Sequence, residues 1–325
     1  MSSVLVTGGA GFIGGHLVEA LVKDGYEVTV VDDLSFGSLD NLQDVLDESS
    51  LSFLKYDIVN ECEKLHQALE GVDIILHLAA IADVRFCQAN PKRAFEVNVN
   101  GTLNLLECLK ALQHRPEKLI YFSSSTVYGE PSKLPTPETY PPNPISIYGV
   151  TKFTSESVIS VYSKLMGFGS IVVRLANVVG SRSTRGLVVD LVNQLRRDSY
   201  KLRVLGDGRQ KKSYIHVEDV VSATIKIINE VNDEGYRVYN VGSIDAIDVM
   251  SVIKVVCEEL GLSMESMDVE FDNRFEGRGW PGDVRTMLLD VSKIEREVGW
   301  APRLTSAEAV RKAVRHLKRC VRHDC

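Results

Sequence analysis

The sequence lacks the segments that would place the chain in or across a membrane. No run approaches the ~18 consecutive apolar residues that a membrane-spanning helix needs. The N-terminus passes from Met1 directly into the apolar run Val4–Val6 and then into glycines, with no basic segment before a long apolar one. We therefore expect no secretory signal, no membrane partner and a cytoplasmic location.

Paired cysteines are also missing. The six cysteines are scattered and none forms a Cys-x-x-Cys pair, which is typical of reduced thiols in a cytosol. Near the C-terminus, His316, Cys320, His323 and Cys325 lie close together and could suggest a metal site. Because this segment otherwise has the pattern of an amphipathic helix that frays at its end, we predict no metal site.

There is no excess of positive charge. The net charge is −7 and the pI is near 5.6, which argues against nucleic acid or an anionic membrane surface as the main partner. An anionic ligand held in a local basic pocket remains compatible with this balance. Apolar residues make up 44% and charged residues 25%, as in an ordinary water-soluble globular protein.

The first half of the chain alternates short apolar runs with helix-like segments. This rhythm predicts an α/β fold, a Rossmann-type doubly wound parallel sheet with helices on both faces. The expected strands are Val4–Val6, Glu27–Val31, Leu51–Lys55, Asp73–Leu78, Lys118–Phe122 and Ser170–Arg174. The expected helices are Ile13–Lys23, Glu61–Leu69, Lys92–Gln113 and Tyr148–Met166.

After about residue 180 the alternation loosens, and no internal repeat or low-complexity segment occurs. We predict a dinucleotide-binding domain over 1–178 to which about 217–245 returns. Residues 179–216 and 246–325 would form a smaller C-terminal α/β domain that binds the substrate. The expected elements here are helices Val217–Val231, Val249–Leu260, Val291–Val298 and Thr305–Arg319, and a strand Val238–Val241.

A glycine-rich segment, Gly8-Gly-Ala-Gly11-Phe-Ile-Gly14, follows the first expected strand and opens the first expected helix. Gly8 permits a tight turn, Gly11 lets the backbone approach a pyrophosphate, and Gly14 lets the helix sit close to the sheet. Phosphates would then meet the N–H groups at the helix N-terminus. The pattern alone is weak evidence, but its strand–turn–helix context favours dinucleotide binding.

Asp32, at the end of the second expected strand, indicates which dinucleotide binds. A carboxylate there can accept hydrogen bonds from an adenosine ribose diol. The pair Asp32-Asp33, with no adjacent arginine, would repel a 2′-phosphate. The sequence therefore favours NAD over NADP.

Tyr148-Gly-Val-Thr-Lys152 places a phenol and an ammonium on one face at the start of a long expected helix. A nearby cation, including an oxidised nicotinamide, lowers the pKa of a phenol, which makes it a usable base near neutral pH. Alone, Tyr-x-x-x-Lys is more often a pair on a helix surface. The hydroxyl-rich segment 122–129 favours a functional role, because it follows a strand at the sheet edge where such folds bind ligands.

The glycine pattern, the serine run that ends in Val-Tyr-Gly129 and the Tyr-x-x-x-Lys motif occur in this order along the chain. In this arrangement the chain resembles the extended short-chain dehydrogenase/reductase superfamily, within its NAD-dependent epimerase/dehydratase family. Nearly the whole chain is similar to UDP-galactose (UDP-glucose) 4-epimerases of archaeal type. The further segments that carry the similarity are Asn98-Val-Asn-Gly-Thr102, Arg174-Leu-Ala-Asn177, Gly206-Asp-Gly208, Tyr214-Ile-His-Val217, Arg278-Gly-Trp-Pro-Gly-Asp283 and Gly299-Trp300.

The resemblance implies the roles of the site residues. Ser124 would touch the sugar oxygen, Tyr148 would act as base, and Lys152 would bind the nicotinamide ribose and lower the tyrosine pKa. The implied NAD contacts are Gly8, Gly11, Phe12, Ile13, Gly14, Asp32, Asp33, Leu34, Ser35, Phe36, Gly37, Asp57, Ile58, Leu78, Ala79, Ala80, Ala82, Asn98, Tyr148 and Lys152. The implied nucleotide-sugar contacts are Ser124, Tyr148, Asn177, Leu187, Val188, Arg203, Val204, Leu205, Lys212, Arg278 and Asp283.

Four positions depart from patterns in that family or in its dehydratase members. Lys212 stands where many members have a phosphate-binding arginine, and Trp280 stands where bacterial epimerases have another. A lysine is a point charge rather than a planar fork, so diphosphate binding by Lys212 and Arg278 is an expectation only. Ser125-Thr126 stands where sugar-nucleotide 4,6-dehydratases carry the Asp-Glu pair that eliminates water, which disfavours dehydration.

The expected reaction is 4-epimerisation of UDP-glucose and UDP-galactose through a transient hydride transfer to tightly bound NAD and a 4-keto sugar. Two alternatives stay open: an epimerase for another nucleotide sugar, such as UDP-N-acetylglucosamine or UDP-glucuronate, and a non-catalytic NAD-sensing protein. Family members commonly dimerise through two helices of each subunit. The counterparts here, Lys92–Gln113 and Tyr148–Met166, lead us to expect a homodimer.

Overall fold

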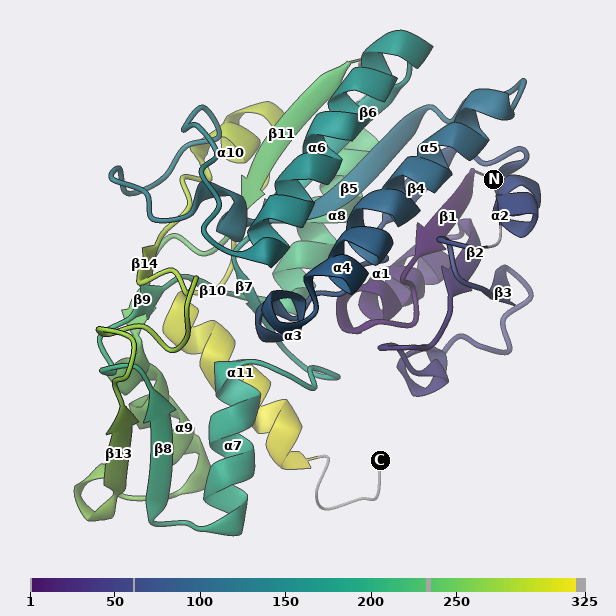
Figure 1. The fold of residues 1–325 in the computed structure, drawn as a ribbon. Helices are drawn as coiled ribbons and strands as arrows, with labels where there is room; N and C mark the ends of the chain where they lie inside the picture. The colour runs from purple at the N-terminus through teal and green to yellow at the C-terminus, as the bar shows by residue number, and fades with distance from the viewer. Residues whose placement is uncertain (1, 61, 232–234, 320–325) are drawn as a thin grey trace. The chain divides into compact units, whose positions relative to one another are not determined.

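The computed structural model describes residues 2–60, 62–231 and 235–319, and divides into two compact units (Figure 1). Unit 1 comprises 1–127, 146–174 and 224–239, and unit 2 comprises 128–145, 175–223 and 240–325. The domain boundaries expected from the sequence differ from these in three places. Segments 128–145 and 175–178 belong to unit 2, and the chain returns to unit 1 over a shorter stretch than 217–245.

Unit 1 is built on a seven-stranded sheet in the order β3-β2-β1-β4-β5-β6-β11. The strands are β1 (Ser3–Thr7), β2 (Glu27–Asp32), β3 (Leu51–Lys55), β4 (Ile74–His77), β5 (Lys118–Ser124), β6 (Gly169–Leu175) and β11 (Tyr236–Val241). Parallel pairing joins β3 to β2, β2 to β1, β1 to β4 and β4 to β5. The first six strands follow the Rossmann order, with the reversal of strand order between β1 and β4. The prediction of a Rossmann-type doubly wound sheet is confirmed.

Helices cover both faces of this sheet, with α5 and α6 on one face and α1 and α8 on the other (Figure 1). Their bounds are α1 (Phe12–Lys23), α2 (Cys62–Leu69), α3 (Val84–Ala89), α4 (Pro91–Phe95), α5 (Gly101–Ala111), α6 (Ile147–Met166) and α8 (Val217–Glu230). A π-helical turn, Glu96–Asn100, joins α4 to α5, so the helix expected over Lys92–Gln113 is one run with a bulge. Glu61, in the helix expected from 61, lies outside the described residues.

The apolar runs of the sequence explain the layering. Every residue of β4 and β6 is buried, as a strand covered on both faces requires. At the sheet edge, β3 is largely exposed even though its sequence, Leu-Ser-Phe-Leu-Lys, is rich in apolar residues. Leu65 of α2, Leu105 of α5 and Ile159 of α6 pack into one core with the central strands. Each such side chain contributes about 1.5–3 kcal/mol on burial.

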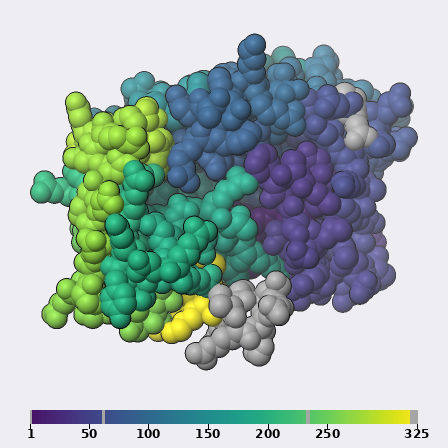
Figure 2. Space-filling model, turned by 60° about the horizontal axis from the view of Figure 1, so that its bottom comes forward, coloured from purple at the N-terminus to yellow at the C-terminus, as the bar shows by residue number. Residues whose placement is uncertain are grey.

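Unit 2 has a separate core with helices and short strands. Its elements are β7 (Asn177–Val179), α7 (Leu187–Arg197), β8 (Lys201–Leu205), β9 (Lys211–Lys212), β10 (Tyr214–His216), β12 (Ile247–Asp248), α9 (Val249–Leu260), β13 (Asp268–Asp272), β14 (Thr286–Met287), α10 (Ser292–Val298) and α11 (Ser306–Arg319). Figure 1 shows α7, β8 and β13 side by side, and β8 pairs with β13 in parallel. In Figure 2 the teal and light green atoms of this unit lie against one another.

The predictions for unit 2 missed α7, β8 and β13. In helix α7 apolar residues recur every three to four positions, as on one face of a helix. This face buries Val188, Leu191 and Leu195 against α9 and α11. Its first turn follows the polar segment Arg182–Arg185, which forms neither helix nor strand. The amphipathic helix expected over Thr305–Arg319 is α11, whereas Cys320, His323 and Cys325 lie outside the described residues.

Within the described ranges 2–60, 62–231 and 235–319, no helix is long and apolar enough to cross a membrane.

A buried lysine joins β5 to the end of α8. Lys118 is 4% exposed, and its ammonium donates to the carbonyls of Ile228 (2.7 Å) and Val231 (2.8 Å). These carbonyls lie at the C-terminal end of α8, where the helix dipole favours a cation.

We expect Lys118→Met to lower the free energy of unfolding by about 2 kcal/mol, because it removes a charged donor and leaves two buried carbonyls without it. The measurement is urea denaturation followed by circular dichroism. The matched control is Lys110→Met, which removes an exposed lysine at a 3.8 Å ion pair and should cost under about 0.5 kcal/mol. Equal losses for the two variants would contradict the capping role.

Candidate active site

The glycine-rich turn after β1 has the geometry that the sequence predicts. Gly8 has a φ of +72°, and a Cβ there would lie 2.7 Å from the backbone nitrogen of Ala79. A Cβ on Gly14 would overlap the Gly8 carbonyl. Both positions therefore accept only glycine, because the turn lies against the end of β4 and α1 starts close to the sheet.

Gly11 differs from these two glycines, since a Cβ there would meet one neighbour, the Gly8 carbonyl at 3.1 Å. Helix α1 begins immediately after it without a side-chain cap. The N–H groups of Phe12 and Ile13 lie in this first turn, where backbone donors and the helix dipole favour an anion.

Asp32 ends β2 beside this turn. Its carboxylate accepts hydrogen bonds from the Ala10 nitrogen at 3.0 Å and the Leu34 nitrogen at 2.8 Å. Burial raises the pKa of Asp32, and the two backbone donors act in the opposite direction. A Cβ on Gly37 would lie 2.8 Å from the Ala10 carbonyl oxygen. The predicted NAD contacts 32–37 therefore lie against the turn 8–11.

The end of β4 is fixed by a polar network. His77 is fully buried between the hydroxyls of Thr7 (2.7 Å) and Thr102 (2.9 Å), and burial lowers its pKa to about 3, so the ring is neutral. Asn98, in the π-helical turn, accepts from the Ile81 nitrogen at 2.7 Å and donates to the Thr151 hydroxyl at 3.0 Å. It thus ties the predicted contacts Leu78, Ala79, Ala80 and Ala82 to α6.

Two more predicted contacts follow β3. The Asp57 carboxylate accepts from the Val59 nitrogen at 2.9 Å and lies 3.8 Å from Arg93. Ile58 is buried against the start of α5, where a Cβ on Gly101 would meet it at 2.8 Å. All of these segments lie at the carboxyl ends of the parallel strands, the edge where doubly wound sheets bind ligands.

Ser124, Tyr148 and Lys152, the catalytic trio predicted from the sequence, come together where β5 meets α6. Tyr148 is 8% exposed and Lys152 is 3% exposed. The Ser124 hydroxyl is a hydrogen-bond partner of the Tyr148 phenol. The Lys152 ammonium donates to the Phe122 carbonyl at 2.7 Å and lies 6.0 Å from the centre of the Tyr148 ring.

The electrostatics of the trio differ from the expectation for the tyrosine. Burial raises the pKa of Tyr148 well above its ordinary value, Cys87 raises it further, and only the Ser124 hydrogen bond lowers it. Burial also lowers the pKa of Lys152 to about 7, against the opposite effect of Glu156 and Cys87. In this structure the chain's own groups therefore keep the phenol protonated at neutral pH.

Four buried residues next to the trio were not predicted as site residues. Glu156 of α6 binds Ser123 of β5 and Arg174 of β6, and Cys87 of α3 packs in a small apolar cluster with Tyr148. Glu156 was detectable in principle, because it stands one helical turn after Lys152 as Lys152 does after Tyr148. Which strand residues it meets depends on the register between helix and sheet, which the sequence does not give.

The predicted nucleotide-sugar contacts, apart from Ser124 and Tyr148, all lie in unit 2. Asn177 starts β7 and donates to the Ser213 carbonyl at 3.0 Å. Arg203, Val204 and Leu205 end β8, with Arg203 paired to Asp272 at 2.9 Å. Leu187 and Val188 begin α7. The side chains of Val188 and Val204 are buried in the core of unit 2, so a ligand there would meet their backbone.

The predicted basic contacts of unit 2 are each paired with a carboxylate. Lys212 donates to Asp283 at 2.5 Å and lies 5.6 Å from the centre of the Trp280 ring. Asp283 also accepts from the Gly279 nitrogen, and Arg278 pairs with Glu130 and with the Asp283 carbonyl. Trp280, a departure at the sequence level, is therefore a partner of Lys212. Glu130 was not predicted.

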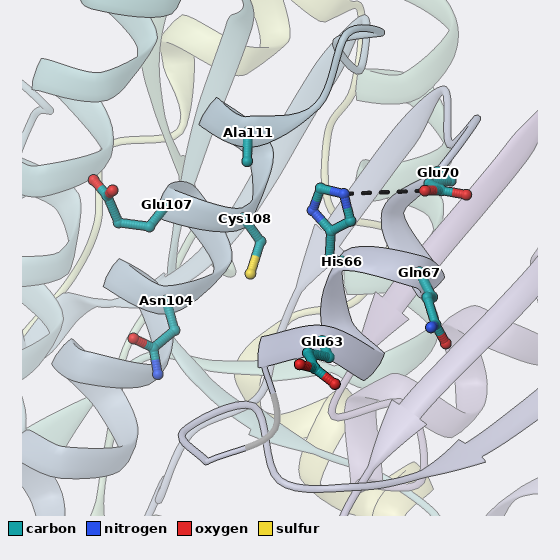
Figure 3. Close-up of a pocket in the computed structure, with 8 residues that line it drawn as sticks. All are labelled: Glu63, His66, Gln67, Glu70, Asn104, Glu107, Cys108 and Ala111. Atoms are coloured by element: carbon teal, nitrogen blue, oxygen red, sulfur yellow. Dashed lines mark ion pairs between the residues drawn. The ribbon is translucent and has the colours of Figure 1, made fainter.

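A hollow of about 530 Å³ is lined by residues of α2 and α5 (Figure 3). Its lining residues are Glu63, His66, Gln67, Glu70, Asn104, Glu107, Cys108 and Ala111. His66 and Glu70 form an ion pair at its rim, 4.0 Å apart. None of the predicted site residues lines it, and it is not part of the candidate active site.

Known proteins resemble this chain over nearly its full length. A candidate UDP-glucose 4-epimerase of the archaeon Methanocaldococcus jannaschii is 30% identical over 97% of this chain and 98% of its own. The crystal structure of a UDP-galactose 4-epimerase is 36% identical, covers 98% of this chain and 99% of its own, and has a TM-score of 0.84. UDP-glucuronic acid 4-epimerase from Bacillus cereus, in complex with UDP-glucuronic acid and NAD, is 27% identical, covers 98% and 99%, and has a TM-score of 0.87.

A family model described as GDP-mannose 4,6 dehydratase matches residues 5–313. The fold, the glycine turn and the Tyr–Lys pair agree with these matches. The chain therefore belongs to the NAD-dependent epimerase/dehydratase family of the short-chain dehydrogenase type, whose members include UDP-sugar 4-epimerases.

Proposed function

We propose that the protein is an NAD-dependent 4-epimerase that interconverts UDP-glucose and UDP-galactose. The observation that carries this proposal is the trio Ser124, Tyr148 and Lys152 without an acid–base pair for dehydration beside it. Position 126 is Thr126, whose hydroxyl donates to Ser124 at 3.0 Å. Hydroxyls with ordinary acidity do not eliminate water as a carboxylate pair does. The similarity to UDP-glucose and UDP-galactose 4-epimerases supports the same choice.

The turn 8–14 and Asp32 fit an NAD dinucleotide. Gly11 leaves room for a phosphate next to the uncapped start of α1, and the Asp32 carboxylate lies at the edge of the same turn. When bound, NAD⁺ would supply a hydride acceptor and a positive charge near the phenol. The Bacillus cereus relative, solved with NAD, supports this assignment.

In this proposal Tyr148 acts as the phenolate, a form that the positive charge of bound NAD⁺ would favour over the protonated phenol. The phenolate removes the proton from the sugar 4-hydroxyl while Ser124 donates a hydrogen bond to the reacting oxygen. Burial raises the pKa of Tyr148, and it also keeps water away from the proton that Tyr148 transfers. Lys152, held by the Phe122 carbonyl, would orient the ribose next to the sugar. Tyr148 returns the proton when the 4-keto sugar is reduced on its other face.

Unit 2 would hold the nucleotide diphosphate. Lys212 and Arg278 are its candidate phosphate ligands, and both are already neutralised by Asp283 and Glu130. A diphosphate would therefore bind by joining or replacing these carboxylates at the cations. Other nucleotide sugars stay open as substrates, and the UDP-glucuronate epimerase among the relatives favours that second candidate.

We also propose that the protein is a homodimer. Val161 and Leu165 of α6 are 54% and 78% exposed, and Leu103 of α5 is 36% exposed. Apolar side chains that gather on neighbouring exposed helix faces mark contact surfaces. Sedimentation equilibrium of the purified chain distinguishes a dimer from a monomer.

Purified protein incubated with UDP-galactose should produce UDP-glucose without added oxidant, because the hydride removed from the sugar is returned to it. The measurement is separation of the nucleotide sugars by anion-exchange chromatography. A 4-keto-6-deoxy product would instead identify a dehydratase. Absence of conversion of UDP-galactose, UDP-N-acetylglucosamine and UDP-glucuronate would refute the epimerase proposal.

Tyr148→Phe should lower kcat by roughly 10³-fold, within the range that a positioned acid–base group contributes. NAD binding, measured by isothermal titration calorimetry, should persist. The control is Tyr26→Phe, which removes a hydroxyl that bonds Asn229 at 3.3 Å on the surface and should leave kcat within about twofold. A Tyr148→Phe enzyme with normal turnover would exclude the phenol as base.

A further inference from the structure

Helix α6 carries a third buried titratable residue, Glu156, in line with Tyr148 and Lys152. Tyr148, Lys152 and Glu156 recur at one-turn spacing, so they lie on one face of the helix. Glu156 is 1% exposed. A carboxylate buried to this degree is costly unless both oxygens are bound.

Both oxygens of Glu156 are bound by groups from two strands. The Ser123 hydroxyl of β5 donates to Oε1 at 2.5 Å. Arg174 of β6 donates through Nε to Oε1 at 3.1 Å and through its terminal nitrogen to Oε2 at 2.6 Å. Glu156 therefore joins α6 to β5 and β6 at the level just below Lys152.

Three consecutive residues of β5 meet three consecutive turns of α6. The Phe122 carbonyl accepts from Lys152, the Ser123 hydroxyl donates to Glu156, and the Ser124 hydroxyl is the partner of Tyr148. A slip of β5 against the helix would break all three contacts together. Of these three contacts, only the Ser123–Glu156 hydrogen bond involves no member of the catalytic trio.

We propose that Glu156 is a positioning residue for the catalytic trio: with Ser123 and Arg174 it fixes the end of β5 against α6, and thereby the Phe122 carbonyl that holds the Lys152 ammonium. This inference rests on the proposed function for its effect on turnover. Its effect on Lys152 does not depend on which sugar is the substrate.

The charges around Lys152 give the expected sign. Burial lowers the pKa of Lys152 to about 7, while Glu156 and Cys87 raise it. The other groups that face the ammonium are neutral or aromatic: His77 from β4, Tyr121 from β5 with its ring centre at 4.6 Å, and Tyr148 from α6. When the negative charge of Glu156 is removed, less opposes the lowering of the Lys152 pKa by burial. The pKa of Lys152 should therefore fall, and the ammonium should lose its proton at lower pH.

The test follows the lysine directly. Carbon-13 NMR of the lysine ε-carbons in the purified full chain, labelled with ¹³C-lysine, reports the titration of Lys152, and Lys152→Met assigns its signal. We expect Glu156→Gln to shift this titration to lower pH by about one unit. Ser123→Ala retains the carboxylate, so it should leave the titration within about 0.3 unit while lowering kcat about tenfold with little change in KM, because the trio is misplaced.

The matched control is Ser163→Ala, a buried serine of the same helix that donates to the Phe168 carbonyl at 2.7 Å. It should change neither the Lys152 titration nor kcat. If Glu156→Gln leaves the titration where Ser163→Ala leaves it, the proposal is overturned. If Glu156→Gln does not fold, Ser123→Ala decides, and an unchanged kcat in that variant overturns the proposal as well.

Failure of the proposed function gives a different result. If the chain turns over no UDP-hexose but the Lys152 titration still shifts in Glu156→Gln, the positioning role stands and the assignment of the substrate fails.

Discussion

The hydrogen bond from the Lys152 ammonium to the Phe122 carbonyl is the contact on which the candidate active site depends. This hydrogen bond holds the ammonium in a buried place, where the loss of contact with water disfavours a charge. Burial therefore lowers the pKa of Lys152 to about 7. The same packing of α6 on β5 buries Tyr148 and aligns Ser124 with it. If α6 packed less closely on the sheet, water would reach both the lysine and the phenol. The pKa of each group would then return toward its ordinary value.

Each unit has its own set of polar groups suited to a ligand. In unit 1 the backbone N–H groups at the start of α1 are donors that suit a pyrophosphate, and the buried carboxylate of Asp32 is an acceptor that suits the hydroxyls of a ribose. In unit 2 the polar groups are side-chain cations, Lys212 and Arg278, each held by a carboxylate. Preformed ion pairs of this kind fix the cations in place before a ligand arrives, which lowers the entropy that binding must remove.

Much of unit 1 could be predicted from the sequence because its signals are local. Apolar runs set β1 to β6 to within two residues at each end, and the glycine turn and Tyr-x-x-x-Lys are readable without a structure. Contacts between elements could not be predicted in this way. The Ser123–Glu156 bond needs the register of β5 on α6, the rise in the pKa of Tyr148 needs its burial, and the placement of 128–145 in unit 2 needs contacts such as Tyr128 to Asn240 at 2.8 Å.

The claim that one carbon is oxidised and then reduced in place is tested most directly by an isotope at that carbon. UDP-galactose that carries deuterium on carbon 4 of the sugar should yield UDP-glucose with the deuterium still on carbon 4, in ordinary water and over many turnovers. Mass spectrometry and proton NMR of the product measure this retention. Loss of the deuterium to water would contradict the account, because it would mean that carbon 4 exchanges a proton with solvent instead of recovering its own hydride.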